Sequence, residues 1–517
     1  MRVAQRPLKR TQVSRTVSVP APVGGWNARD PLADMAPKDA VSLDNMFCSP
    51  TDVAVRAGYS QWATGMTGMI NSVCSYSPPS GTQELYAAVG EYIYDVSASG
   101  AVGAAVVSGQ TSDKWQHVNF GTSGGNFLYM VNGVDKPQLY DGSTWVAVDG
   151  VSTPAITGVT TTSLTNICSH QSRLWFIEKN TMKVWYLPTS SIGGAANPIN
   201  FSSLFTRGGY LVSMGSWSLD AGYGMDDYAV FATSEGQMAI YKGNDPASAS
   251  TWALIGIYDV GSPIGRRCMR KYAGDLTVIS RDGLLPLSKS LMSSRVSSRE
   301  TLTDKIQTVM SEYTTLYGGN FGWQTVQFPQ ENMLLVNVPV SASVSYQLAM
   351  NTITGAWSRF LGWNAACFEL HNDSLYFGGN GVVCKAWDSY TDNGNNIAFD
   401  GQQSFNYLGN SSQNKHVSMA RPIISTDGNV GLLLGVNVDF DLTAPTGTPT
   451  FSPSTAGSWD SGTWDVAAWG GDLEIKKEWQ TVSGVGYCFS AHLKGSTKGA
   501  RLRWASTDYL ASVGGVI

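Results

Sequence analysis

Charged side chains are scarce in this chain. Asp, Glu, Lys and Arg make up 14% of its 517 residues, whereas about a quarter is usual in soluble domains. Hydrophobic residues stay at 43%, so Ser, Thr, Asn and Gly replace the missing charge. This composition excludes a coiled coil and a disordered chain kept open by its own charge.

Motifs that bind metals or cofactors are missing as well. The seven cysteines are dispersed without a C-x-x-C pair, and the five histidines show neither H-x-x-x-H nor H-E-x-x-H spacing. An odd, scattered set of cysteines favours reduced thiols in a cytosol-type compartment, and neither residue type supports a zinc site. The glycine-rich stretches lack a Walker lysine and a G-x-G-x-x-G pattern, so we expect no cofactor.

Long apolar runs are also absent. None reaches the ~18–20 residues that a membrane-spanning helix needs, and the first 15 residues lack the apolar core of a signal peptide. Residues 1–29 instead hold six basic side chains and no acid, a charge of +6. Because the whole chain has a net charge of −5, the remaining residues carry −11. An acidic body with a basic leader is not the charge distribution of a surface that grips nucleic acid.

Glycine and aromatic residues are plentiful, and they recur in strand–turn–strand units. Each unit alternates apolar and polar residues around a turn with Gly or Asn, which is typical of a hairpin with one buried face. The units span residues 84–97, 126–148, 172–187, 228–243, 275–288, 332–360 and 373–388. Their starts lie 41–57 residues apart, which favours a β-propeller of six or seven blades over stacked β-sandwiches.

The pattern changes near residue 395, where a long alternating strand at 429–442 precedes a Trp-rich stretch at 457–471. We therefore predict an all-β fold, a β-propeller with a composite β-rich platform domain built from both chain ends. The expected domains are a basic arm at 1–19, the first part of the platform at 20–60, the propeller at 61–394 and the second part of the platform at 395–517.

Two segments are predicted to form helices within this all-β chain. Residues 297–318 carry apolar residues at helical spacing, with a capping box at Ser297 and Glu300 and a closing Gly318. We expect Leu302, Ile306, Val309, Met310 and Tyr313 to form the buried face. Residues 36–47 are predicted to be a short helix with Pro37 in its first turn.

Catalytic constellations are not recognisable. The stretch at 458–464 is close to the Asp-box turn of sialidase-like propellers, but that turn has no catalytic role. A glycosidase needs two converging carboxylates, and nothing in the sequence brings Asp226, Asp227, Glu235 and Asp282 together. We therefore expect no enzyme activity, and the simpler interpretation is that these four carboxylates belong to turns.

Two basic clusters are candidate contact sites. The first is the leader, with Arg2, Arg6, Lys9, Arg10 and Arg15, which we interpret as an arm that orders on a partner. The second comprises Arg266, Arg267, Arg270 and Lys271, which either solvate a blade edge or contact DNA phosphates or an acidic neighbouring subunit.

Residues 24–59 resemble the N-terminal platform segment of tail nozzle (tail tubular protein B-like) proteins of short-tailed bacteriophages. The resemblance rests on a Gly-Gly-x-Asn turn, an Asp in a Pro-containing loop, an Asp-Asn-plus-aromatic element and an Arg-x-Gly-Tyr strand end. The residues concerned are Gly24, Gly25, Asn27, Asp30, Pro31, Asp44, Asn45, Phe47, Arg56, Gly58 and Tyr59. The C-terminal stretch 502–517 and the blade around 280–306 are also similar to the family, so about a quarter of the chain is covered.

The resemblance implies a structural virion protein that forms a hexameric tube below the portal and adaptor rings. Expected partners are further copies of itself, the portal and adaptor proteins, tail fibre or spike proteins, and double-stranded DNA in transit. Assembly would take place in the bacterial cytoplasm, and the final location would be the virion tail. An acidic wall suits a conduit, because it repels phosphate and lets DNA slide.

Strand edges give a physical reason to expect a ring. The strand at 429–442 and the C-terminal strand at 509–517 carry little charge, and exposed edges of that kind need protection or a partner. The alternative is that both strands pair within their own chain. The rival functions are a propeller-type receptor- or carbohydrate-binding viral adhesin and a sialidase-like enzyme.

Overall fold

The computed structural model describes residues 14–220, 225–248, 250–292, 301–428, 430–447 and 473–513. The chain divides into two compact units. The first, which we call the platform, comprises residues 1–57, 353–359 and 390–517, and the second, the propeller, comprises 58–352 and 360–389. The unit boundaries thus fall at 57/58 and 389/390, beside the expected 60/61 and 394/395, and residues 353–359 group with the platform.

The described residues of the propeller form seven sets of antiparallel strands, which we call blades, and each contains one of the seven hairpins that the sequence predicts. Blade 6 consists of the first three strands of a nine-stranded sheet. Blade 1 contains β7 (Ser72–Tyr76), β8 (Glu84–Val89) and β9 (Tyr92–Asp95). Blade 2 contains β11 (Gln116–Thr122), β12 (Gly125–Val131), β13 (Gln138–Tyr140) and β14 (Trp145–Ala147). Blade 3 contains β16 (Leu164–His170), β17 (Arg173–Glu178), β18 (Lys183–Tyr186) and β20 (Asn197–Asn200).

Blade 4 contains β21 (Leu211–Asp220), β22 (Met225–Thr233), β23 (Gln237–Gly243) and β24 (Trp252–Asp259). Blade 5 contains β25 (Met269–Tyr272), β26 (Asp275–Ser280) and β27 (Gly283–Pro286), and blade 6 contains β28 (Gln324–Phe328), β29 (Met333–Pro339) and β30 (Ser345–Asn351). Blade 7 contains β32 (Cys367–His371), β33 (Ser374–Gly378), β34 (Val383–Ala386) and β6 (Tyr59–Thr64), to which β10 (Gly100–Ala101) adds a short parallel pair. A separate two-stranded pair joins β15 (Ile156–Thr157) to β19 (Gly194–Ala195).

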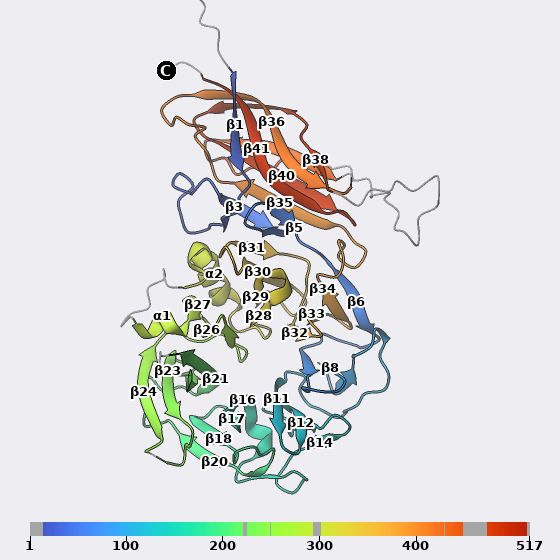
Figure 1. The fold of residues 1–517 in the computed structure, drawn as a ribbon, viewed down its shortest axis with the longest axis vertical. Coiled ribbons are helices and arrows are strands. Elements are labelled where there is room, and N and C mark those ends of the chain that lie inside the picture. Colours follow the sequence, from blue (N-terminus) through green and yellow to red (C-terminus); the bar gives the residue numbers. More distant parts are fainter. Residues whose placement is uncertain are drawn as a thin grey trace, which may run out of the picture. The chain divides into compact units, whose positions relative to one another are not determined.

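The ring of blades is closed. The innermost strands contact one another in cyclic order, from β7 through β11, β16, β21, β25, β28 and β32 back to β7 (Figure 1). Blade 7 itself is completed by the first strand of the unit, because β6 pairs antiparallel with β34. The fold class predicted from the sequence is therefore confirmed, with seven blades.

Apolar residues fill the spaces between neighbouring blades. One cluster between blades 3 and 4 packs Trp175, Phe231 and Trp252, with the two indole rings stacked at 5.5 Å. Similar clusters lie between blades 1 and 2, 2 and 3, 4 and 5, and 7 and 1. Aromatic residues in these clusters serve as blade core, where flat rings bury much area.

Helices are few in the described chain. They are η1 (Thr161–Ser163), α1 (Leu287–Met292), η3 (Asp304–Ile306), α2 (Gln307–Tyr317) and η4 (Pro329–Glu331). α2 contacts β27 and β29. Ile306 at the end of η3 and Met310 in α2 are both 0% exposed, whereas Val309 in α2 and Leu302 before η3 are half-buried. The predicted amphipathic helix is therefore confirmed from Asp304 onward, and its capping box lies outside the described residues.

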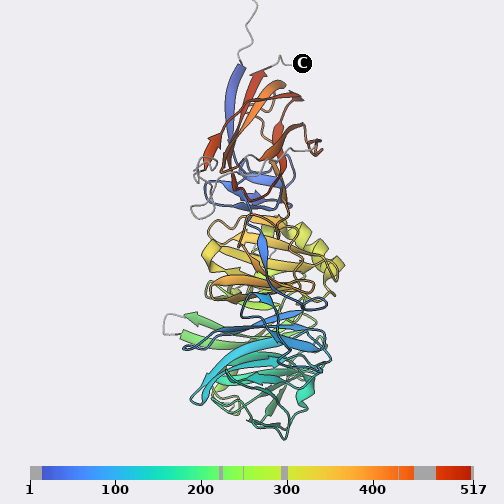
Figure 2. The same cartoon turned by 90° about the vertical axis from the view of Figure 1, so that its right-hand side faces the viewer.

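The platform consists of two β-sheets, and each combines strands from the N-terminal and the C-terminal part of the chain. The first sheet runs β38 (Glu474–Lys476), β36 (Lys415–Thr426), β41 (Leu502–Val513), β5 (Val53–Val55), β4 (Met46–Cys48), with β39 (Gln480–Gly486) on β36 and β1 (Ser14–Pro20) on β41. The second runs β31 (Trp357–Phe360), β3 (Asp39–Asp44), β35 (Ile397–Gln403), β40 (Phe489–Thr497), β37 (Gly431–Val438), with β2 (Gly25–Trp26) on β3. The N-terminal β1 runs beside β41 in both views (Figures 1 and 2).

Two expectations for the platform are wrong. Residues 36–47 form strands β3 and β4 instead of a helix, because Ala40 and Leu43 enter the core and Asn45 takes a left-handed φ of 54°, which a helix does not allow. The C-terminal strand does not expose its edge over the described residues 509–513, because β41 is paired with β36 on one side and β1 on the other.

Candidate functional site

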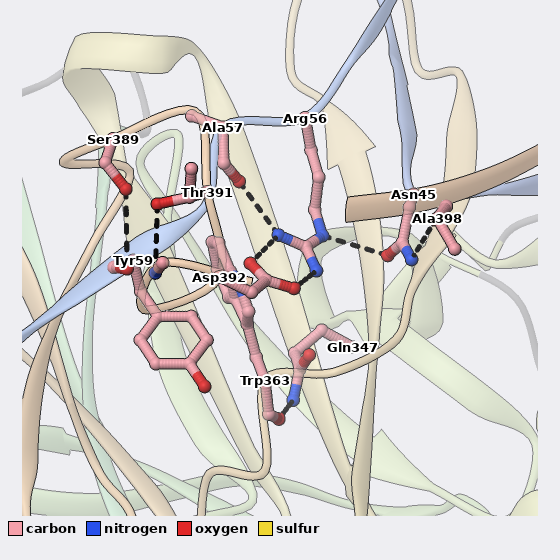
Figure 3. Close-up of polar contacts among 11 residues, drawn as sticks. Asn45, Arg56, Ala57, Tyr59, Gln347, Trp363, Ser389, Thr391, Asp392 and Ala398 are labelled. Carbon is pink, nitrogen blue, oxygen red and sulfur yellow. Dashed lines mark hydrogen bonds and ion pairs between the residues drawn. The ribbon is translucent and has the colours of Figure 1, made fainter. Parts of the chain in front are cut away.

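The residues that carry the family resemblance form a buried polar network in the platform (Figure 3). Arg56 is 1% exposed and donates both Nη atoms to the carboxylate of Asp392, at 2.8 and 2.7 Å. Its Nε donates to Asn45 Oδ1 at 2.9 Å, and Asn45 Nδ2 in turn donates to the carbonyl of Ala398 at 2.7 Å. This network ties the N-terminal segment to a segment more than 330 residues later, so it has a structural role.

The Gly-Gly-x-Asn turn forms a second network of the same kind. Asn27 is buried, and its Nδ2 donates to Asp39 at 2.7 Å and Asp30 at 2.8 Å. A Cβ on Gly24 would lie 2.4 Å from Asp39 Oδ1, and Gly25 has a φ of +81° with its Cβ position 2.6 Å from a backbone nitrogen. Only glycine fits both positions, so the motif is explained by close packing.

The edge of the second platform sheet is a candidate assembly surface. β37 ends this sheet and contains no charged residue. Its outer edge has no partner strand within the part of the chain that the structure describes. Exposed apolar side chains occur elsewhere in the same unit, at Leu442, Ile475, Val485 and Tyr487, each more than 40% exposed. The segment after the strand packs against part of it, because Asn437 Nδ2 donates to the Thr443 carbonyl at 2.7 Å and Pro445 lies beside Gly435. Apolar edges without a partner strand and exposed apolar side chains mark surfaces that pair with another chain.

The propeller has a cavity of about 160 Å³ along its axis, lined by residues from the innermost strand of every blade or from the turn before it. Arg266 and Arg267 both line it, but their guanidinium groups bind backbone inside the ring. Arg266 Nη1 donates to the carbonyl of Asn132 at 3.0 Å, and Arg267 Nη2 donates to the Trp115 carbonyl and Ser72 Oγ, both at 2.8 Å. Burial lowers the pKa of Arg266.

An imidazole–carboxylate pair shares this axial cavity. His117 Nε2 lies 3.5 Å from Glu369 Oε1, and both residues line the cavity wall. Burial disfavours a charged imidazole, but Cys74 and Glu369 raise the pKa of His117 to about 10. The Glu369 carboxylate therefore favours the charged form of the imidazole beside it.

The predicted basic cluster is divided by the structure. Arg266, Arg267 and Arg270 line the axial cavity and Lys271 does not, although Arg270 and Lys271 are both exposed on β25. In the leader, Arg15 lies on the exposed strand β1. Arg2, Arg6, Lys9 and Arg10 lie outside the described residues, as does the Trp-rich stretch at 457–471.

A larger pocket of about 510 Å³ lies beside the axial cavity and shares Arg266 with it. Lys179, Tyr210, Glu235 and Arg281 also line this pocket. These four side chains are polar, and they include two basic groups and one carboxylate.

The carboxylates considered for glycoside hydrolysis do not form a pair. Asp227 lies near the start of β22 and Glu235 follows its end, which separates them by roughly 20–25 Å at the usual rise of a strand. Asp282 lies in the β26–β27 turn, and the side chain of Asp226 lies outside the described set. Over the described residues, no group of three His, Cys, Asp or Glu could hold a metal ion. No described helix is long and apolar enough to cross a membrane.

Sequence reasoning missed the axial residues His117, Glu369, Gln116 and Asn166. A signal was available, because each of them lies within the first few residues of the innermost strand of its blade. Aligning the hairpins as repeats, with the strand before each hairpin included, would have placed them at one recurring position.

Known proteins resemble this chain only weakly. No protein-family model matches the chain, and no curated protein matches its sequence. Similar solved structures include "YCF48 bound to D1 peptide" (TM-score 0.36, 9% identity, 67% of this chain and 98% of that one) and the Myceliophteria thermophila Cps50 (Swd1) β-propeller domain (0.39, 11%, 63% and 98%). A glycoside hydrolase family 43 arabinoxylan arabinofuranohydrolase from Bacillus subtilis also aligns (0.25, 10%, 91% and 95%). At these scores the likenesses carry no argument about function, and the propeller assignment rests on the ring of seven blades.

Proposed function

We propose that this protein is a structural component of the tail of a short-tailed bacteriophage. In this proposal, copies of the chain assemble into a ring, six-fold by the family resemblance, and the ring is a conduit for genome retention and ejection below the portal and adaptor. The protein acts by assembly without catalysis. Its partners are further copies of itself, the connector proteins, tail fibre or spike proteins and DNA in passage.

The observation that carries this proposal is the unpaired edge of β37. The strand holds eight residues without charge, and one of its two edges pairs with β40 while the other is left without a strand partner among the described residues. Monomeric proteins protect such edges with charge, proline or a covering segment. A head-to-tail contact that closes on itself satisfies the edge and produces a ring.

The platform network supports the same proposal. Residues of the resembling segment, among them Gly24, Gly25, Asn27, Asn45 and Arg56, hold the platform together. A rigid platform is what a ring wall needs, since neighbouring copies must present their edges at a fixed angle.

The test is the oligomeric state of the full-length protein and of an edge variant. We expect native mass spectrometry and negative-stain images of the wild type to reveal closed rings. Val436→Lys places a charge on β37 and should reduce ring formation at least about tenfold. The control is Val151→Lys, at a propeller position that is 91% exposed, which should leave ring formation unchanged. A wild-type chain that stays monomeric at every concentration would contradict the proposal.

The alternative is a propeller-type viral adhesin, and the 510 Å³ pocket with Lys179, Tyr210, Glu235 and Arg281 favours it. A glycan-binding screen distinguishes the two functions. Binding that is lost in Tyr210→Ala, by a chain that forms trimers or no oligomer, would support the adhesin.

A further inference from the structure

The axial cavity contains more hydrogen-bonding capacity than the surrounding protein uses. Gln116 Nε2, Asn166 Oδ1 and Thr325 Oγ1 are buried without a hydrogen-bond partner, and these side chains belong to residues only 8%, 5% and 2% exposed. All three residues line the cavity and come from three different blades. Gln116 Nε2 and Thr325 Oγ1 can donate to a guest, whereas Asn166 Oδ1 only accepts and needs a protonated oxygen such as that of hydrogen phosphate. Buried polar atoms are rarely left without partners, so a shared set of them marks a place for a polar guest.

One guanidinium completes this set. Arg267 Nη2 is held by three acceptors, the carbonyls of Asn71 and Trp115 and Ser72 Oγ, at 2.8–3.1 Å. Its Cζ lies over the ring of Phe321, 5.1 Å from the centroid. Nη1 of the same group is buried and has no partner. The group is therefore held by several contacts, and one of its nitrogens, with two N–H donors, still lacks an acceptor.

The charge of the lining is uneven. His117 and Glu369 offset each other at 3.5 Å, while Arg266, Arg267 and Arg270 have no carboxylate partner among the described residues. Arg270 is exposed, whereas Arg266 and Arg267 are half-buried. Cationic groups that are partly shielded from solvent without a counter-charge are costly, and guanidinium groups match the geometry of tetrahedral oxyanions. A volume of about 160 Å³ admits an inorganic anion but not a nucleotide or a strand of DNA.

We propose that the axial cavity of the propeller binds a small inorganic oxyanion of the size of phosphate or sulfate. Arg267 Nη1 and Gln116 Nε2 donate to its oxygens, Thr325 donates its hydroxyl proton, and Arg266 and Arg270 supply charge. The anion bridges the inner strands of several blades, so it acts as a structural ligand that stabilises the closed ring. The proposal is independent of the nozzle function.

The experiment measures the melting temperature of the full-length protein against inorganic phosphate, with sulfate as a second arm and chloride at matched ionic strength as reference. We expect saturating phosphate to raise the transition of the propeller by about 3–5 °C. Gln116→Met keeps the shape of the side chain and removes the donor, and Arg270→Gln removes charge without breaking any bond to the protein. Each should weaken phosphate binding at least about threefold in calorimetry.

Two controls keep the test decisive. Arg207→Gln makes the same charge change on the outside of blade 4, and Gln138→Met alters a buried glutamine whose amide is already bonded to the Lys136 carbonyl. Both should bind phosphate as the wild type does. Melting that responds equally to phosphate and chloride, or a crystal structure from phosphate buffer with only water on the axis, would overturn the proposal.

Discussion

The propeller and the platform are both built from antiparallel strands, but they differ in how far apart along the chain their partners lie. Within most blades, paired strands follow each other along the chain, as in β22 and β23, and the exception is blade 7, where β6 pairs with β34. In the platform, Ser14 pairs with Ser512 and Ala40 with Gln403. The propeller is therefore an array of local hairpins, whereas the platform depends on contacts that close loops of several hundred residues.

This difference determines what stabilises each unit. The blades pack against each other through apolar clusters, such as the one around Trp217 and Leu276. The platform adds polar pairs that fix a single register, the buried Arg56 on Asp392 and the half-buried Arg359 on Asp44, both at 2.7 Å. Apolar packing tolerates small shifts, while paired charges with bidentate geometry do not. Substitutions should therefore destabilise the two units for different reasons.

The largest loss is expected in the propeller at Ile306. This side chain is fully buried, so Ile306→Asp removes apolar packing and buries a charge without a partner, at a cost of about 4–5 kcal/mol. Leu316→Asp on the same helix is the control, because that side chain is 61% exposed. Denaturant unfolding measures both. Equal stability of the two variants would mean that α2 does not pack as the structure has it.

In the platform the largest loss is expected at Arg56. Arg56→Met leaves Asp392 and Asn45 Oδ1 without their donor and should cost about 3–4 kcal/mol in the platform transition. The double variant Arg56→Met/Asp392→Leu should recover part of this loss, because no buried charge remains unpaired. A loss confined to the propeller transition in calorimetry would contradict the assignment of this network to the platform.

The same contrast explains what could be predicted from the sequence. The seven hairpins were found because their alternation and turns are local, and the buried face of α2 was found because Ile306 and Met310 are one turn apart. Residues 36–47 were misread as a helix because the partners that make them strands, β35 and β31, lie more than 300 residues away. Local propensity has no information about such partners.

The candidate sites follow the same rule. Arg266 and Arg267 were selected as part of a basic cluster, but their place on the propeller axis depends on ring closure. Gln116, His117 and Glu369 carry no motif, and only the meeting of seven inner strands brings them together. The platform motif could be recognised in the sequence through the family resemblance. Only the structure explains why the motif has these residues, because Arg56 donates to Asp392 and Asn45 donates to the carbonyl of Ala398.

A pH-dependent loss of intermediate size is expected in the propeller. Burial lowers the pKa of His170 to about 4, against opposing attraction from Asp227 and with a small contribution from Lys271. The unfolded chain binds this proton near pH 6.5, so between pH 6.5 and pH 4 the unfolded state holds more protons and stability falls as the pH falls. The loss is on the order of 2–3 kcal/mol.

The matched variant for this effect is His170→Asn, which can keep the hydrogen bond to Ser216 Oγ but does not titrate. Its unfolding free energy should depend less on pH between 6.5 and 4.5 than that of the wild type. Burial also lowers the pKa of His371 in the same unit, so a smaller slope of the same sign should remain. An unchanged slope would exclude His170 as the titrating group.

The smallest expected effects compare one ion pair from each unit. In the propeller, Lys136 Nζ lies 2.7 Å from Asp149, but the lysine side chain is 52% exposed, so Lys136→Met should cost about 0–0.5 kcal/mol. In the platform, Arg421 lies 2.8 Å from Asp508, whose side chain is 11% exposed, and stacks 4.6 Å from the ring centroid of Trp479. Arg421→Met should therefore cost about 1–1.5 kcal/mol, since it loses a shielded ion pair and a cation–π contact.

Raising the salt concentration should remove most of the effect of Lys136→Met and less of the effect of Arg421→Met, because exposed pairs are screened more strongly. Equal losses of stability in the two variants, with equal responses to salt, would mean that polar pairs contribute equally to the two units. The blades and the platform would then not differ in how much they depend on polar pairs.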